Sequence, residues 1–195
     1  RHILHPQVLK AFKVLCIYPG FVYGNAFDTY DIDTFMQGVA EALRDIPNVH
    51  LTIKLRGPRQ EAFSRRRIAE ICKEIPHTVV RDTPLPVLFE GSDAVISCYS
   101  TAMLEAMQSG VPLIFFAATP LEVRFAHAHI PPYLTAGALK LAENKKELAR
   151  ALSVLVSEEA RRTLVEHANH FLAEDYAFDG RSAERAAKLI RKLAK

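Results

Sequence analysis

The chain has few cysteines, no CxxC pair and no long apolar run. Its 195 residues include three cysteines, Cys16, Cys72 and Cys98, and an odd number of widely separated thiols supports neither a disulfide framework nor a zinc site. No apolar segment reaches the roughly 20 residues that a membrane-spanning helix needs, and the first residues do not follow the plan of a signal peptide. These absences predict a folded cytoplasmic protein with free thiols.

Two common phosphate-binding motifs are also missing. No GxGxxG follows the first predicted strand, which disfavours a dinucleotide cofactor, and no GxxxxGK[ST] occurs. A response-regulator receiver would need clustered aspartates at the ends of its first and third strands, and Tyr18, Val80 and Arg81 occupy those places. The sequence therefore excludes three frequent functions of α/β proteins.

What is present is an ordinary globular composition with a weak positive charge. Hydrophobic residues make up 49% and charged residues 24%, and the formal charge is +3. That charge helps to attract a small anionic ligand, but it is too weak and too evenly spread to predict a nucleic-acid surface. The length fits one domain, or one and a half.

Short apolar runs alternate with helical patterns along the chain. Strands are expected at 13–18, 50–55, 78–80, 94–97 and 113–116. The helices between them are expected at 31–44 (starting at Asp31 or Asp33), at 60–75, in a short stretch that follows the loop 81–86 and ends at Phe89, and at 101–109. Further helices are expected at 122–128, 145–156, 158–175 and 182–193, with no strand among them. This alternation predicts an α/β fold with a doubly wound parallel sheet and extra C-terminal helices.

We expect three parts: a lead segment (1–11), a Rossmann-like domain (12–175) and a C-terminal helical segment (176–195) that packs on this domain or on a missing N-terminal domain.

The stretch from Ser92 to Phe116 reads as one complete βαβ unit. A helix that begins just past the carboxyl end of a parallel strand presents backbone N–H groups and its positive dipole end, which suits a phosphate. Ser100 is the expected N-cap, and Gly110 the expected stop. Glu105, one turn inside, could accept hydrogen bonds from a ribose. It could equally serve only as a partner of the helix dipole.

The same stretch carries a recognisable pattern, SDAVIS followed by YSTAMLEAMQSGVPLI. With the order of elements over about residues 12 to 195, it resembles the C-terminal, nucleotide-sugar-binding half of glycosyltransferases of the GT-B fold. The tail FDGRSAERAAKLI is similar to the closing helix of bacterial enzymes that make capsular or other surface polysaccharides.

The resemblance implies a transferase half that takes a sugar from a nucleoside-diphosphate sugar and passes it to a glycan or lipid-linked acceptor. It implies no cofactor and no required metal. The acceptor site and catalytic base would come from an N-terminal domain or partner subunit, so the chain alone is expected to be inactive. The expected location is the cytoplasm, with peripheral association of the full protein at the inner face of the membrane.

It also implies roles for individual residues. Lys54, and with it Arg56, would stabilise the leaving diphosphate. The diphosphate would lie on Ser100, Thr101 and Ala102, and Glu105 would hold the ribose. The remaining predicted contacts are backbone approaches to the phosphates by Gly24 and Asn25, and a frame for the base made by Val80, Arg81 and Asp82.

Departures from the family pattern leave alternatives open. The His-Pro pair that many relatives carry after the second-strand lysine is absent here, where Leu55, Arg56, Gly57 and Pro58 follow Lys54. Nucleotide-sugar 2-epimerases share the architecture but usually carry Ser-Gly-Gly where this chain has Ser-Thr-Ala at 100–102. An epimerase-like isomerase half, and a noncatalytic nucleotide-binding or assembly module, are therefore the alternative functions.

Other candidate groups receive structural interpretations. The pairs His127/His129 and His167/His170 are expected to be solvated rather than metal ligands. Cys98, at a strand end, has no partner base that the sequence identifies. We expect Arg65, Arg66 and Arg67 to form a solvated outer face, and Phe21, Tyr23, Phe27 and Tyr30 to divide between the core and the ligand site.

Overall fold

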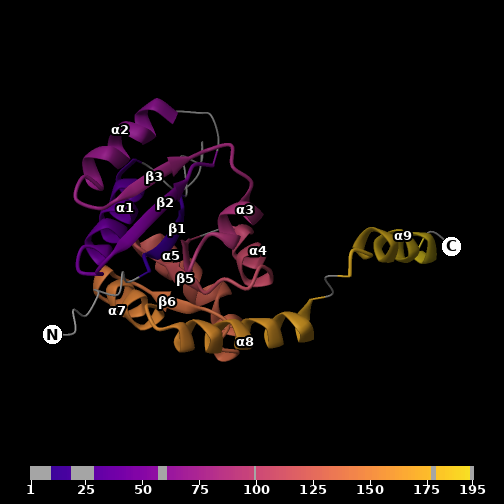
Figure 1. Ribbon diagram of the computed structural model, residues 1–195. Helices are drawn as coiled ribbons and strands as arrows, with labels where there is room; N and C mark the ends of the chain where they lie inside the picture. Colours follow the sequence, from indigo (N-terminus) through magenta and orange to yellow (C-terminus); the bar gives the residue numbers. More distant parts are fainter. Residues whose placement is uncertain (1–9, 19–28, 57–60, 99, 177–178, 194–195) are drawn as a thin grey trace.

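The computed structural model describes residues 10–18, 29–56, 61–98, 100–176 and 179–193 (Figure 1). Its centre is one sheet of six parallel strands in the order β3-β2-β1-β4-β5-β6. These strands are β1 (Phe12–Ile17), β2 (Val49–Lys54), β3 (His77–Val80), β4 (Ala94–Ser97), β5 (Leu113–Phe116) and β6 (Lys140–Ala142). The predicted α/β fold class is confirmed.

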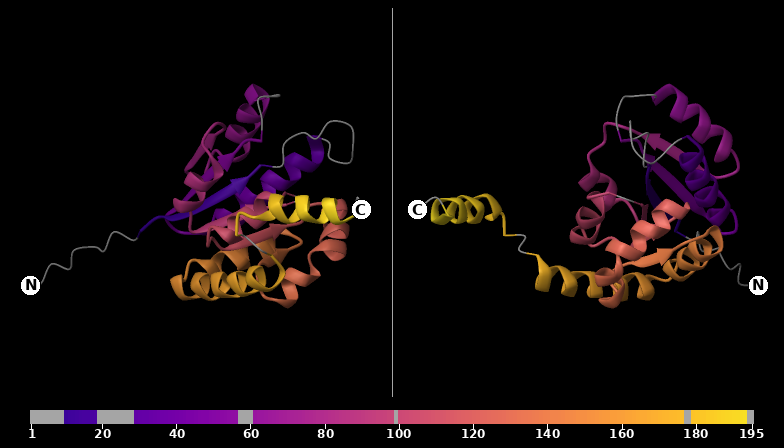
Figure 2. Two further views of the ribbon diagram at one scale, coloured as in Figure 1. Left: turned by 90° about the vertical axis from the view of Figure 1, so that its right-hand side faces the viewer. Right: turned by 180° about the vertical axis from the view of Figure 1, so that it is seen from behind.

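Successive residues of the strands face opposite sides of the sheet, and both sides are covered. Val14 and Cys16 pack into one hydrophobic cluster, and Leu15 between them packs into the other. The first layer contains α1 (Thr29–Leu43), α2 (Glu61–Ile71) and α7 (Lys145–Leu155). The second contains α3 (Leu85–Glu90), α4 (Ala102–Gln108), α5 (Pro120–His129), α6 (Pro131–Thr135) and α8 (Glu158–Asp175). Figure 2 shows the two layers from the side and from behind.

The sixth strand was not predicted, because the segment after residue 128 was taken to be helical throughout. β6 has only three residues, too few to show a strand periodicity in sequence. It exists through pairing with β5, in which Ile114 lies opposite Lys140 and Phe116 opposite Ala142. Helix α1 also begins earlier than expected, at Thr29, so Asp31 and Asp33 lie inside it.

Local hydrogen bonds fix the helix ends that border the sheet. Beyond α4, the N–H of Val111 donates to the carbonyl of Ala106 (3.1 Å), and the N–H of Gly110 donates to the carbonyl of Met107 (3.0 Å). Gly110 has φ +71°, so this is the Schellman ending that its position predicted. Helix α5 starts with Pro120 and a capping box between Thr119 and Glu122.

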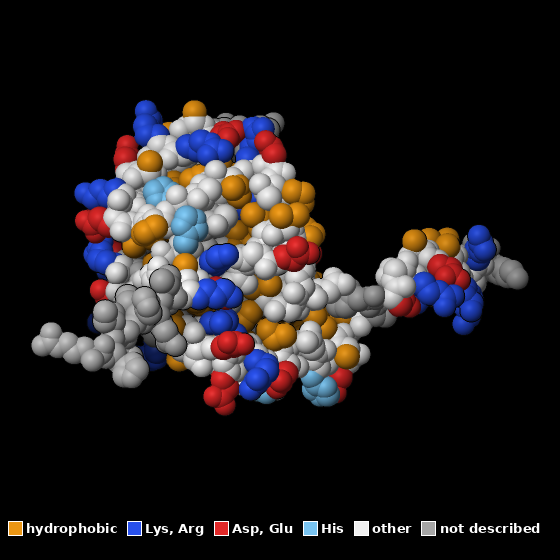
Figure 3. Space-filling model, viewed as in Figure 1, with side chains coloured by type: hydrophobic (Ala, Val, Ile, Leu, Met, Phe, Trp, Pro, Cys, Tyr) orange, Lys and Arg blue, Asp and Glu red, His pale blue; other side chains and the backbone are white. Residues whose placement is uncertain are grey.

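The last helix, α9 (Ser182–Leu193), stands beyond the end of α8, apart from the sheet and its layers (Figures 1 and 2). None of its residues is buried, and Leu189, Ile190 and Leu193 are 57%, 66% and 77% exposed. Figure 3 shows hydrophobic side chains on one side of this helix and charged ones on the other. That its apolar side packs against another body remains a prediction.

Candidate functional site

The strand order places a topological switch point between β1 and β4. From β1 the chain winds outward through β2 to β3, and then returns to β4 and winds the opposite way to β6. In open parallel sheets the crevice at the carboxyl ends of the two central strands is where ligands bind. A cleft of about 200 Å³ lies there, lined by Ile17, Tyr18, Lys54, Leu55, Arg56, Leu85, Ser97, Cys98, Ser100, Thr101, Ala102 and Glu105.

Six residues predicted from the sequence meet in this cleft. They come from the end of β2 and from the first turn of α4: Lys54, Arg56, Ser100, Thr101, Ala102 and Glu105. Sequence reasoning missed the others. The residues at the ends of β1 and β4 could have been found from the strand boundaries, whereas Leu85 reaches the cleft from α3 and no sequence signal marks it.

The three residues predicted to frame a base do not line the cleft. Arg81 instead forms ion pairs with Glu61 (2.5 Å) and Asp82 (2.8 Å). The bond to Asp82 and the charges of both carboxylates raise the pKa of Arg81, and the guanidinium of Arg81 lowers the pKa of Asp82. The ammonium of Lys54 donates to the carbonyl of Arg81, so this loop touches the site through Lys54. Gly24 and Asn25 lie outside the described residues.

The N-cap of α4 is Thr101, one residue after the predicted Ser100, but Ser100 still bonds to the first turn of the helix. Its hydroxyl accepts from the N–H of Ala102 (3.2 Å), and its carbonyl accepts from the N–H of Met103 (3.2 Å). One N–H group predicted to hold a diphosphate is therefore already bonded within the protein. A phosphate oxygen would take the place of the Ser100 hydroxyl, which could then itself donate to the ligand.

Two charged side chains of the cleft are available to a ligand. Glu105 and Arg56 are both exposed, and neither side chain has a hydrogen bond or ion pair among the described residues. They come from opposite sides of the cleft, Glu105 from α4 and Arg56 from the segment after β2. A ligand with an anionic part and hydroxyl groups would satisfy both.

Cys98 has a partner that the sequence did not reveal. Its thiol is hydrogen-bonded to the carboxylate of Glu122, which also accepts from the N–H groups of Ala118 (2.7 Å) and Thr119 (2.9 Å). Glu122 is 1% exposed, and burial raises its pKa. This carboxylate links the end of β4 to the turn after β5. Cys98 itself is 2% exposed, in keeping with a structural thiol.

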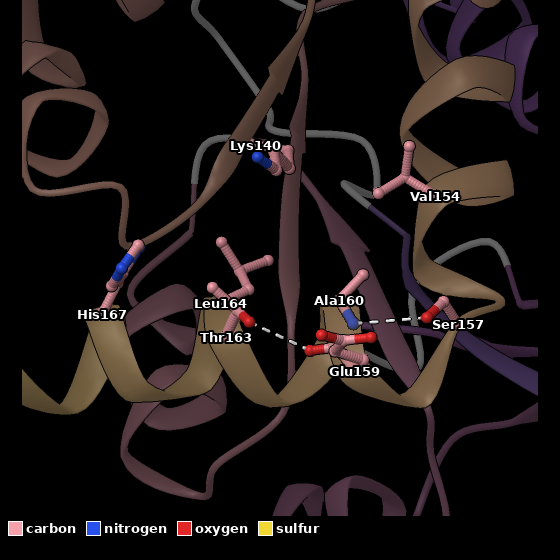
Figure 4. A pocket seen from close by; sticks show the side chains of 8 residues that line it. All are labelled: Lys140, Val154, Ser157, Glu159, Ala160, Thr163, Leu164 and His167. Carbon is pink, nitrogen blue, oxygen red and sulfur yellow. Dashed lines mark hydrogen bonds between the residues drawn. The ribbon is translucent and has the colours of Figure 1, made fainter.

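A larger cavity, of about 370 Å³, lies elsewhere, between β6, the end of α7 and α8 (Figure 4). Its polar groups serve the helix itself: Ser157 accepts from the N–H of Ala160 (3.4 Å), and Thr163 donates to the carbonyl of Glu159 (3.1 Å). Lys140, Glu159 and His167 also line this cavity, but no hydrogen bond or ion pair joins these three described side chains to one another. We therefore place the site in the smaller cleft, where charged groups converge.

One histidine of each pair is close to a carboxylate. His127 pairs with Glu143 (2.5 Å) and His170 with Glu174 (3.2 Å). Within the described ranges, no three His, Cys, Asp or Glu side chains are grouped so that they could hold a metal ion. Among the described helices, none combines the length and apolar composition needed to cross a bilayer.

Comparison with solved structures identifies the same fold in larger enzymes. Sucrose-phosphate synthase from Thermosynechococcus elongatus superposes with a TM-score of 0.66 at 18% identity, over 95% of this chain and 46% of that one. UDP-GlcNAc 2-epimerase from Neisseria meningitidis, bound to UDP-GlcNAc, superposes with a TM-score of 0.61 at 15% identity, over 83% of this chain and 40% of that one. The C-terminal domain of a group 1 glycosyl transferase (LpcC) from Francisella tularensis superposes with a TM-score of 0.57 at 15% identity, over 86% of this chain and 87% of that one.

The chain thus spans less than half of the two complete enzymes and most of the isolated C-terminal domain. No protein-family model matches it, and no curated protein matches its sequence. The chain has the fold of the C-terminal half of GT-B enzymes, which confirms the predicted fold.

Proposed function

We propose that the chain is the donor-binding half of a glycosyltransferase, which uses a nucleoside-diphosphate sugar and a glycan or lipid-linked acceptor. The observation that supports this most strongly is the cleft at the switch point. The cleft brings together a cation from β2, the hydroxyls and N–H groups before α4, and a carboxylate one turn later that has no partner among the described residues, which are groups suited to a diphosphate and a ribose.

Each group has a defined task in this proposal. When the glycosidic bond breaks, negative charge develops on the leaving diphosphate, and Lys54 with Arg56 stabilises it there. Ser100 and Thr101 orient the phosphates through hydroxyl and N–H groups. Glu105 accepts from the ribose hydroxyls. The carbonyl of Arg81 holds the Lys54 ammonium in place and leaves two of its three donors for the ligand.

A 2-epimerase-like isomerase half is the second candidate. The similar fold of the Neisseria meningitidis epimerase supports it. The sequence Ser-Thr-Ala at 100–102 weighs against it, because these enzymes usually carry Ser-Gly-Gly there. Turnover of a nucleotide sugar without an acceptor, in the presence of the missing half, would favour the isomerase.

A glycosyltransferase would also need an acceptor site, and an isomerase would need the second half of the cleft. In this proposal, either one lies on another domain or subunit. The exposed apolar side of α9, which includes Leu189, Ile190 and Leu193, is the surface we assign to that contact. Burying the three side chains would contribute several kcal/mol at about 25 cal/mol per Å² of apolar surface.

Calorimetric titration of the chain with UDP, CDP, GDP and ADP tests the proposal. We expect weak binding of at least one nucleotide, and no sugar transfer by the chain alone. Binding of none of the four would contradict the donor site. Sugar transfer by the isolated chain would contradict its assignment as one half of an enzyme.

A further inference from the structure

A second cavity opens directly beside the cleft. It has a volume of about 340 Å³ and shares three lining residues with the cleft, namely Arg56, Ser100 and Thr101. From there it runs between the first turn of α4 and the side chains of α5 and α6. A molecule whose phosphates lie on Ser100 and Thr101 therefore has its next chemical group at the entrance of this cavity.

The walls of the second cavity are apolar and aromatic. Met103, Leu104, Phe125, Ile130 and Tyr133 provide them. Phe125 stacks on Phe115 with ring centroids 6.3 Å apart, and its ring lies 4.4 Å from that of His129.

Tyr133 is also held in place, by contacts with two aromatic side chains. Its ring centroid lies 4.8 Å from that of Phe171, and its hydroxyl is hydrogen-bonded to that of Tyr176 (3.1 Å). The rings are thus positioned before any ligand arrives, which lowers the entropic cost of binding against them.

The polar side chains of the cavity are few. No Asp, Glu, Asn or Gln occurs among the described residues that line it; besides the three shared residues, only His129 and the Tyr133 hydroxyl are polar. Phe125 and Tyr133 are only partly buried, so water reaches the outer part of the cavity, but hexose hydroxyls turned toward the apolar wall would be left without partners, which costs free energy for each one. A sugar in which an apolar substituent replaces a hydroxyl fits this surface better.

We propose that the second cavity receives the glycosyl group of the donor, and that it selects a sugar with an apolar substituent, such as a 6-deoxy methyl group, over the plain hexose. This proposal rests on the proposed function of the adjoining cleft. The diphosphate bridges the two cavities at Ser100 and Thr101, the nucleoside lies over Glu105, and the substituent packs on Phe125 and Leu104.

Matched pairs of donors test the selectivity. Calorimetry would compare UDP, UDP-glucose and UDP-6-deoxyglucose, and likewise GDP, GDP-mannose and GDP-6-deoxymannose of the same configuration. In at least one series we expect the apolar-substituted sugar to bind about 10-fold more tightly than the hexose, the scale of one methyl-sized group in an apolar pocket. Equal affinities in both series, or tighter binding of the hexose, would overturn the proposal.

Variants of the lining residues test whether the sugar preference arises in the second cavity. Leu104→Gln and Phe125→Leu should each reduce the preference to about 2-fold or less, while the affinity for the bare nucleotide stays within about 2-fold of the wild type. Val87→Gln, on an exposed position of α3 that lines neither cavity, is the matched control and should keep the full preference.

The two proposals fail in different ways. Binding of a bare nucleotide without any sugar preference, or with a preference that both cavity variants retain, overturns the selectivity and leaves the donor site intact. Absence of binding by every nucleotide overturns both.

Discussion

The two sides of the cleft use their polar groups differently. On the β2–β3 side, most charged groups are already held by the protein: Lys54 by the Arg81 carbonyl, and Arg81 by Glu61 and Asp82. On the β4–α4 side, the carboxylate of Glu105 has no partner among the described residues. The first side is thus largely organised by the protein itself, with Arg56 as its one charged side chain in the cleft that has no partner in the described ranges, and the second presents its charged group to a ligand.

This difference separates the residues that position Lys54 from the groups that recognise a ligand. The ion pair between Arg81 and Asp82 reaches the surface, with side-chain exposures of 33% and 80%, so it contributes little to stability, whereas Glu61 in the second pair is partly buried, at 23%. Their effect is to hold the loop after β3, and thereby the carbonyl that orients Lys54. The second side determines which ligand satisfies the exposed groups.

The largest effect is expected from Lys54→Ala. Loss of a charge-assisted bond to a diphosphate costs about 1.5 to 3 kcal/mol, which corresponds to a decrease in nucleotide affinity of about 10- to 100-fold. The melting temperature should change little, because the ammonium makes its described contact with a single carbonyl. Calorimetry and thermal denaturation measure the two quantities.

Lys145→Ala is the matched control for Lys54→Ala, since Lys145 forms an exposed ion pair with Glu41 outside the cleft. A large fall in melting temperature for Lys54→Ala, with affinity intact, would show that Lys54 serves the fold.

Glu105→Ala should have a smaller effect, a decrease in nucleotide affinity of about 10-fold. Because the predicted partner is the ribose, the variant should also lose most of the preference for a ribonucleotide over its 2′-deoxy form. The melting temperature should stay nearly unchanged, whereas Glu166→Ala, on the exposed surface of α8, should change neither quantity. If Glu105→Ala lowers the melting temperature and leaves binding intact, Glu105 is only a partner of the helix dipole.

The sequence was sufficient for the parts of the fold that have strong local signals. Apolar runs predicted β1 to β5, and Gly110 and Pro120 marked helix ends whose hydrogen bonds the structure shows. The site at the β2 and β4 edges followed, because the carboxyl ends of parallel strands lie on one side of a sheet.

Long-range contacts were not predictable in the same way. The strand order depends on which strands pair, and β6 is a strand only because β5 lies beside it. The bond between Cys98 and Glu122 joins residues 24 positions apart through the tertiary fold. Similarly, nothing local to the sequence indicated that the side chain of Arg81 would pair with Glu61, at the start of α2; whether the main chain at Arg81 frames a base stays a prediction.

The smallest effect is expected from a substitution of Glu122, the buried residue whose carboxylate links the end of β4 to the turn after β5. Burial raises the pKa of its carboxyl above the ordinary value of 4.5. A group whose pKa is raised on folding contributes stability that is fully present below the unfolded-state pKa and is lost as the pH rises through the folded-state value. The wild type should therefore lose stability between pH 4.5 and neutrality relative to Glu122→Gln, whose amide carbonyl can still accept from Ala118 and Thr119.

Urea unfolding of both proteins across this pH range measures that difference, with Glu166→Gln, an exposed carboxylate on α8, as the control. Parallel stability curves for the wild type and Glu122→Gln would show that the buried carboxylate keeps its ordinary protonation. In that case the two backbone N–H groups stabilise its charge fully, and the β4–α4 side, like the β2–β3 side, rests on a compensated charge.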